Sequence, residues 1–116
     1  MTYKPRRASS RWLDLDCPPE VLAIKDSGPK VADRYTVIYA PPSAGTTYAD
    51  MVLGYRGMSE SPCHPQGVGM WGEFSAHECA AFRYRTRSIA WSKLPYQVRD
   101  CVRRDCESFR QQESAA

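Results

Sequence analysis

The chain has 116 residues, the usual length of one domain, and 42% of them are hydrophobic and 25% charged. That balance excludes a largely disordered chain, and no apolar run approaches the roughly 20 residues of a membrane span. The basic start is not followed by an apolar stretch, so no secretory signal is expected and a cytoplasmic location is the default.

Both ends of the chain are basic and its middle is acidic, although the formal net charge is only +3. Residues 1–19 carry four basic and two acidic groups, residues 20–80 four and seven, and residues 81–116 eight and four. A mimic of DNA should be acidic throughout, so this class of protein is disfavoured. The five cysteines are odd in number and irregularly spaced, which favours reduced thiols over disulfides.

The first half of the chain predicts a basic arm followed by three strands. Residues 1–19 combine three prolines with four basic side chains and predict an extended N-terminal arm. Strands are expected near 20–25 and 33–40, where strand-forming residues flank a Gly-Pro turn, so that the two form a hairpin. A third strand is expected near 50–56.

The next part of the chain predicts a long loop, a short helix and a fourth strand. Two prolines and three glycines between Ser59 and Glu73 are expected to exclude a regular element there. Ser75 and Glu78 have the spacing of a capping box, which predicts a short helix that reaches about Phe82. The segment 85–91 predicts a strand.

The helix expected over 95–109 has the clearest periodicity. Its apolar residues recur at helical spacing on one face, and Pro95 suits a first helical turn. These apolar residues are Val98, Cys101, Val102, Cys106 and Phe109. The expected fold is α+β, a small antiparallel sheet of three to four strands with this C-terminal helix packed on one face. It occupies residues 20–110 as a single domain, and residues 111–116 are expected to be a disordered tail.

Three segments of the chain resemble a known group of proteins. They are Ala32-Asp-Arg-Tyr-Thr-Val37, His64-Pro-Gln-Gly-x-Gly with Gly72-Glu73, and Leu94-Pro-x-x-Val98. The resemblance is to small uncharacterised proteins of bacteriophages and mobile elements, and it spans about residues 20–109. It implies a phage origin, the cytoplasm of the infected bacterial host as the location, and no established biochemical activity. Cys63 departs from the pattern, because an aromatic residue is expected there.

The His-Pro-Gln-Gly loop is the densest motif in the chain. Gly67 and Gly69 permit positive φ and close backbone approach, and a proline stiffens the chain on either side of His64. Such a loop can hold the His64 imidazole and the Gln66 amide in fixed directions, and Glu73 follows it. The alternative is that both side chains only satisfy backbone groups of their own loop.

A zinc site is a weak candidate in the same region. Cys63, His64, His77 and Cys79 supply the thiolates and imidazoles that zinc prefers. Adjacent ligands such as Cys63 and His64 rarely reach one ion and no Cys-x-x-Cys pair is present, so no cofactor is expected. A nucleophile and base made of Cys79 and His77 is also disfavoured, because two residues apart on a helix they point in different directions.

A partner-binding surface is the third candidate. The segment 82–99 interleaves aromatic and basic side chains without an acid, and on a strand over 83–87 three arginines would share one face about 6–7 Å apart. Such a stripe pairs with phosphates or with an acidic protein surface, unless it is a solvated face paired with the acidic middle of the chain. The expected partner-binding residues are Arg83, Tyr84, Arg85, Arg87, Trp71 and, on the arm, Arg6, Arg7 and Arg11.

These features suggest three functions, in order of preference. The first is a non-enzymatic phage protein that binds and inhibits a host protein or ribonucleoprotein complex. A CRISPR or other anti-phage defence effector is its natural target, which would make the protein anti-CRISPR-like. The second is a basic accessory protein that binds nucleic acid. The third is a small zinc or hydrolase domain centred on His64. None of the three involves a membrane.

Overall fold

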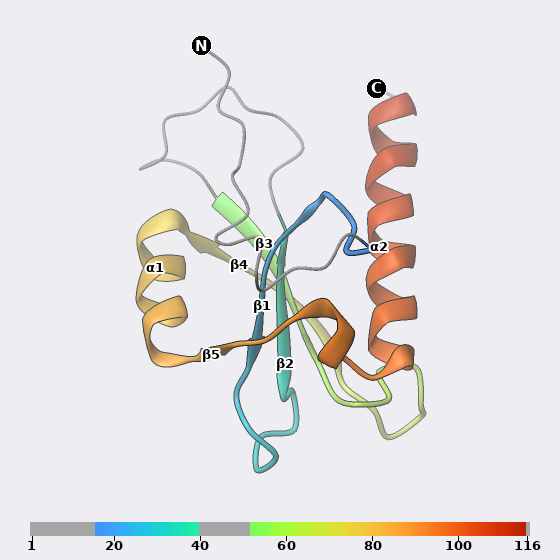
Figure 1. Cartoon of the computed structure of the whole chain (residues 1–116). Helices are drawn as coiled ribbons and strands as arrows, with labels where there is room; N and C mark the ends of the chain where they lie inside the picture. The colour runs from blue at the N-terminus through green and yellow to red at the C-terminus, as the bar shows by residue number, and fades with distance from the viewer. Residues whose placement is uncertain (1–15, 40–51, 116) are drawn as a thin grey trace.

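The computed structural model describes residues 16–39 and 52–115, and these form one antiparallel sheet with two helices (Figure 1). The sheet order is β4-β3-β2-β1-β5, and a short 3-10 turn, η2, links the last strand to the second helix. Among these residues, no helix combines the length and apolar character of a membrane span. The elements are β1 (Val21–Asp26), β2 (Tyr35–Tyr39), β3 (Val52–Met58), β4 (Gly69–Ser75), α1 (Ala76–Arg85), β5 (Arg87–Ser88), η2 (Trp91–Lys93) and α2 (Tyr96–Ala115).

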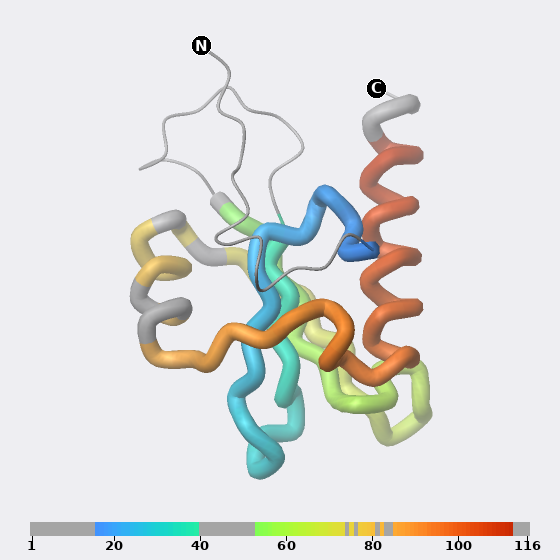
Figure 2. The backbone as a smooth tube through the Cα atoms, in the orientation of Figure 1, coloured from blue at the N-terminus to red at the C-terminus, as the bar shows by residue number. Residues whose placement is uncertain are grey.

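The α+β class and the antiparallel sheet are confirmed, with five described strands in place of three to four. Helices cover both faces of the sheet, α2 on one side and α1 on the other (Figures 1 and 2). Side chains alternate between the faces along β2. Tyr35, Val37 and Tyr39 pack in the cluster under α2, while Ile38 packs with Cys79 of α1. All of β2 is therefore buried, which makes it the centre of the core.

The expected stripe of α2 is confirmed. Four of its five apolar residues are buried in the core cluster on that side of the sheet, and the partly buried Phe109 packs against that cluster. Trp91 of η2 completes this cluster and is only 1% exposed. The helix does not end near 109 but continues to Ala115, so residues 111–115 are helical rather than a disordered tail.

Strand β4 corrects the expectation that 59–73 holds no regular element. All seven of its residues pair with β3, from Val52↔Ser75 to Met58↔Gly69. Gly72 allows the Tyr55 ring to pack closely against this strand, because a Cβ at position 72 would lie 2.3 Å from Cζ of Tyr55. Glycine at this position therefore leaves room for an aromatic ring on the next strand.

Helix α1 begins as expected and ends later. The Ser75 hydroxyl accepts a hydrogen bond from the Glu78 N–H, and the Glu78 carboxylate accepts one from the Ser75 N–H, so the capping box is confirmed. The helix runs on to Arg85, and the chain becomes extended at Thr86, later than the start of the strand expected from 85 to 91. What remains of that strand is the two-residue β5, paired with the end of β1.

Candidate functional site

The His-Pro-Gln-Gly motif lies in the loop that closes the β3–β4 hairpin. The last strand pair is Met58↔Gly69, and beyond it the Ser59 N–H donates to the Val68 carbonyl at 3.0 Å. The Ser59 hydroxyl in turn accepts from the Val68 N–H at 2.9 Å. The motif therefore lies at one end of the sheet. One backbone and one side-chain hydrogen bond between Ser59 and Val68 close the loop that contains it.

Within the loop the motif residues bond to one another. His64 Nδ1 accepts from the Gln66 N–H at 3.1 Å, and the His64 carbonyl accepts from the Gly67 N–H at 2.7 Å. The His64 N–H donates to the Ser61 carbonyl at 3.1 Å. These contacts support the interpretation that the motif organises its own loop. The side chains of His64 and Gln66 are exposed.

Gly67 is the tightest point of this loop, since a Cβ there would lie 2.0 Å from the Ser61 carbonyl oxygen. Gly67→Ala is expected to lower the free energy of unfolding by about 2–3 kcal/mol, because backbone has to move to admit the methyl group. Gly54→Ala is the matched control, because a Cβ at that strand position meets nothing within 4 Å. Urea unfolding followed by tryptophan fluorescence compares the two variants, and equal midpoints would contradict the expectation.

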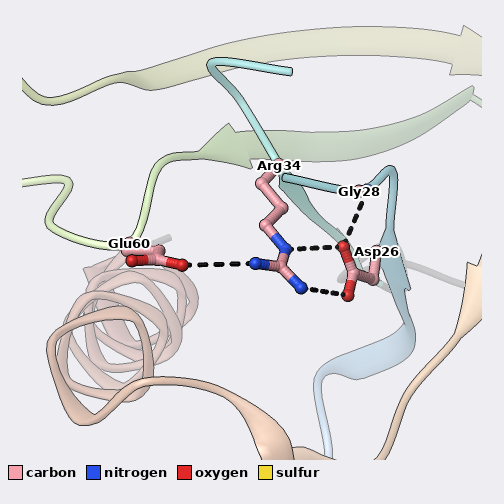
Figure 3. A network of polar contacts seen from close by, with 4 residues as sticks. All are labelled: Asp26, Gly28, Arg34 and Glu60. Carbon is pink, nitrogen blue, oxygen red and sulfur yellow. Dashed lines mark hydrogen bonds and ion pairs between the residues drawn. The ribbon is translucent and has the colours of Figure 1, made fainter. Parts of the chain in front are cut away.

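An open groove of about 550 Å³ lies between this loop and the β1–β2 turn. Arg34 is one of its lining residues, and Figure 3 shows Arg34 between Asp26 and Glu60. Arg34 Nε and Nη2 donate to the two oxygens of Asp26 at 2.9 and 3.0 Å, and Nη1 donates to Glu60 at 3.3 Å. The groove is lined by Pro29, Val31, Ala32, Arg34, Ser59, Glu60, Ser61, His64, Gln66 and Gly67.

The charges of this groove compensate one another. The hydrogen bonds from Arg34 lower the pKa of Asp26, and the Gly28 N–H, which donates to the same carboxylate at 2.9 Å, lowers it further. All three guanidinium nitrogens of Arg34 are engaged. Arg34 therefore links the β1–β2 turn to the β3–β4 loop, and this accounts structurally for the arginine of the Asp-Arg-Tyr segment.

The weak zinc candidate gains no support from the part of the chain that the structure describes, which contains no group of three or more potential ligands. Cys63 is exposed, and its Sγ lies 3.9 Å from Nη1 of Arg104 on α2. Cys79 is buried with Leu22 and Ile38 on the opposite face of the sheet. His77 lies exposed on α1. The sheet thus separates the two thiols.

The expected arginine stripe over 83–87 does not form, because residues 83–85 belong to α1 and the strand that follows consists of residues 87–88. Residues two apart on a helix lie on different sides of it. Nothing is described of the side chains at 83 and 84, and Arg6, Arg7 and Arg11 lie outside the described residues. Trp71 is also separate from Arg87, because β4 and β5 are opposite edges of the sheet, roughly 19 Å apart at the usual strand spacing.

A longer run of basic side chains replaces the stripe. It follows the chain from the end of α1 through β5 and η2 into the first turns of α2, the orange segment of Figure 1. We call it the basic belt, made of Arg85, Arg87, Lys93, Arg99 and Arg103. All are exposed except Arg99, which is half-buried.

Few acids oppose the basic belt. Between Glu78 and Asp105 the only acid in the sequence is Asp100, which accepts from Arg103 Nη1 at 3.3 Å. Asp26 is a second nearby carboxylate, and the charge of Arg87 contributes to the lowering of its pKa. Tyr96, 62% exposed, adds an aromatic ring. The basic segment 82–99 of the sequence already contained Arg85, Arg87, Lys93 and Arg99. Arg103 was not indicated, because only the folded chain places its guanidinium over the Trp91 ring of η2.

Trp71 forms a second exposed feature at the other edge of the sheet. Its ring centroid lies 5.1 Å from the Arg56 guanidinium carbon and 5.7 and 6.0 Å from the rings of Tyr39 and Phe109. The side chain is nevertheless 51% exposed, and the neighbouring Met70 is 61% exposed. These contacts hold a large aromatic in place at the surface. Glu73 lies exposed farther along the same strand.

No family model, curated protein or solved structure matches this chain. The phage resemblance of the three short segments therefore stays a hypothesis. The function has to be inferred from the geometry of the basic belt and of the edge around Trp71.

Proposed function

We propose that this protein is a non-enzymatic binding protein that docks through its basic belt on an acidic surface of a host macromolecular complex and inhibits it. The five cations of the belt support this proposal, since they lie on consecutive elements and, among the described residues, Asp100 and Asp26 are the carboxylates that interact with them. The phage resemblance points to an anti-phage defence effector, such as a CRISPR effector, as the target.

The chemistry of the belt suits recognition of acidic groups. Guanidinium groups bind carboxylates in a bidentate manner, and Arg and Tyr are common at the energetically important positions of interfaces. Arg103 is also held over the Trp91 ring, 5.4 Å from its centroid, so part of the belt is ordered before binding. A positive surface of this kind raises the rate of association with a negative partner.

Nucleic acid is the alternative partner of the same cations. Phosphates attract arginine as carboxylates do, and the exposed Tyr96 ring could stack on a base. Binding of this kind loses affinity steeply with salt, because phosphate contacts release counterions. A protein partner with specific contacts is less sensitive, so the salt dependence distinguishes the two kinds of partner.

A pull-down of the tagged protein from nuclease-treated host lysate, with mass spectrometry, is expected to yield a stoichiometric protein complex. On that complex, Lys93→Glu is expected to weaken binding about 10-fold, and the triple reversal of Arg85, Arg87 and Lys93 about 100-fold. Lys30→Glu is the matched control, because this exposed lysine lies on the β1–β2 turn and changes the net charge equally.

Equal affinities of the Lys93→Glu and Lys30→Glu variants would show that net charge matters and the belt does not. Recovery of nucleic acid alone, lost after nuclease treatment, would favour the alternative partner. A complex whose activity is unchanged by bound protein would contradict inhibition while leaving binding intact.

A further inference from the structure

Strand β4 has a free edge among the described residues, because its only strand partner there is β3. Just beyond the strand the Ser59 N–H donates to the Val68 carbonyl, the position of a hydrogen-bonded pair in the ladder. Bonded and non-bonded pairs alternate along an antiparallel ladder, so Met70 and Gly72 bond to β3. The N–H and C=O groups of Gly69, Trp71 and Glu73 consequently point away from the sheet.

The side chains at this edge are exposed on both faces of the sheet. Trp71 lies on the α2 face, since it contacts Phe109. Met70, the next residue, points to the opposite face, and each is more than half exposed. A flat docking surface could cover only one of them. A strand added alongside β4 would contact both, and would also satisfy the outward backbone groups.

We propose that a second copy of this chain pairs with β4 in the antiparallel direction, with the two-fold axis at Trp71. Trp71 is then opposite Trp71 of the second copy, and Gly69 is opposite Glu73. The three outward residues of each strand form about six backbone hydrogen bonds between the copies. The result is one continuous sheet through two molecules, in the manner of an isologous interface.

This register also matches the side chains on the α1 face. Met70 comes opposite Gly72 of the second copy, where no side chain obstructs it. The Tyr55 ring lies across Gly72, since a Cβ there would be 2.4 Å from its hydroxyl oxygen. Met70 therefore packs on an aromatic ring of the second copy, a favourable contact for a thioether. Any larger residue in place of Gly72 would displace that ring.

Charge complementarity supports a second copy rather than an unrelated strand. Glu73 is exposed and lies on the same face as Trp71. In the proposed register it comes opposite Gly69, at the end of the sheet where Arg104 contacts the β3–β4 loop. Among the described residues neither Glu73 nor Arg104 has an ion-pair partner. The two-fold axis thus brings each Glu73 toward an Arg104 of the other molecule.

The other edge of the sheet is less suited to such pairing, because β5 has only two residues. Three residues of the basic belt, Arg85, Arg87 and Lys93, lie on β5 or next to it in the chain, and so the dimer leaves them accessible in both copies. Dimer formation and partner binding are therefore independent, and failure of either proposal would leave the other intact.

Sedimentation velocity of the full chain tests this proposal. The protein is expected to be dimeric at ~100 µM and to dissociate on dilution. Glu73→Pro removes an outward N–H that β3 does not use, whereas Glu73→Ala keeps it. The proline variant is expected to dimerise roughly 30-fold more weakly than the alanine variant, since two hydrogen bonds are lost per dimer. Circular dichroism checks that both variants stay folded.

A charge exchange tests the register. Glu73→Arg and Arg104→Glu are each expected to weaken the dimer about 10-fold, and the double variant is expected to regain most of the loss. A protein that stays monomeric at roughly 500 µM would overturn the proposal. A dimer that responds equally to Glu73→Pro and Glu73→Ala would overturn the edge pairing, and a double variant no better than the single ones would overturn the register.

Discussion

Replacing Asp105 with alanine is expected to lower the free energy of unfolding by about 3–4 kcal/mol. Asp105 is 7% exposed and joins three elements, since it accepts from Tyr39 Oη at 2.7 Å on β2 and pairs with Arg56 Nη1 at 2.5 Å on β3. Burial raises the pKa of Asp105, and the hydrogen bond from Tyr39 and the charge of Arg56 oppose that rise. Removing the carboxylate leaves a buried hydroxyl and a mostly buried cation without their partner.

The matched control is the double variant Arg56→Met, Asp105→Leu. It removes both charges and leaves apolar side chains of similar length, so it is expected to recover at least half of the lost stability. Urea unfolding measures the three proteins under the same conditions. If the double variant is as unstable as Asp105→Ala, the loss comes from the unpaired Tyr39 hydroxyl or from packing under α2, and not from the uncompensated Arg56 charge.

Replacing Trp91 with alanine is expected to cost about 3–5 kcal/mol, as for other large aromatic residues in a core. Trp91 is 1% exposed and packs with Leu94, Val98 and Val102, so it fills the space between η2 and α2. The variant leaves a cavity that the surrounding strands and helix cannot close. Thermal unfolding followed by circular dichroism is expected to show a marked drop in Tm.

Trp91→Phe separates the apolar contribution of the ring from its polar atom. No described residue accepts a hydrogen bond from the buried Nε1 of Trp91. Phenylalanine keeps most of the ring and removes this unsatisfied donor, so a loss of only ~1 kcal/mol is expected. A loss as large as that of Trp91→Ala would show that phenylalanine cannot fill the space of the larger ring.

The parts of the fold that depend on local physics could be predicted from the sequence. The capping box at Ser75 and Glu78 needs only residues three apart, and the helical stripe from Val98 to Phe109 needs only its own spacing. The strand near 33–40 was equally readable from its strand-forming residues. In each case the deciding interactions lie within one element.

Strand β4 could not be predicted, because its stability comes from pairing with β3 and from the Tyr55 ring beside Gly72. The two prolines and three glycines between Ser59 and Glu73 favour a loop as long as the position of the neighbouring strand is unknown. The end of α1 was missed for a related reason, since alternation in 83–87 fits a strand as well as a helix end until the neighbours are placed.

Sequence patterns were enough to establish the α+β class, the two helix starts and the basic character of the segment from Arg85 to Arg103. Three relations became visible only in the folded chain. Trp71 and Arg87 lie at opposite edges of the sheet, Cys63 and Cys79 lie on opposite sides of it, and the outward groups of β4 have no strand partner among the described residues. Charge and periodicity are properties of one segment, so they can be read from its residues. Distances between segments depend on strand order, which loop closure and burial settle for the whole chain together.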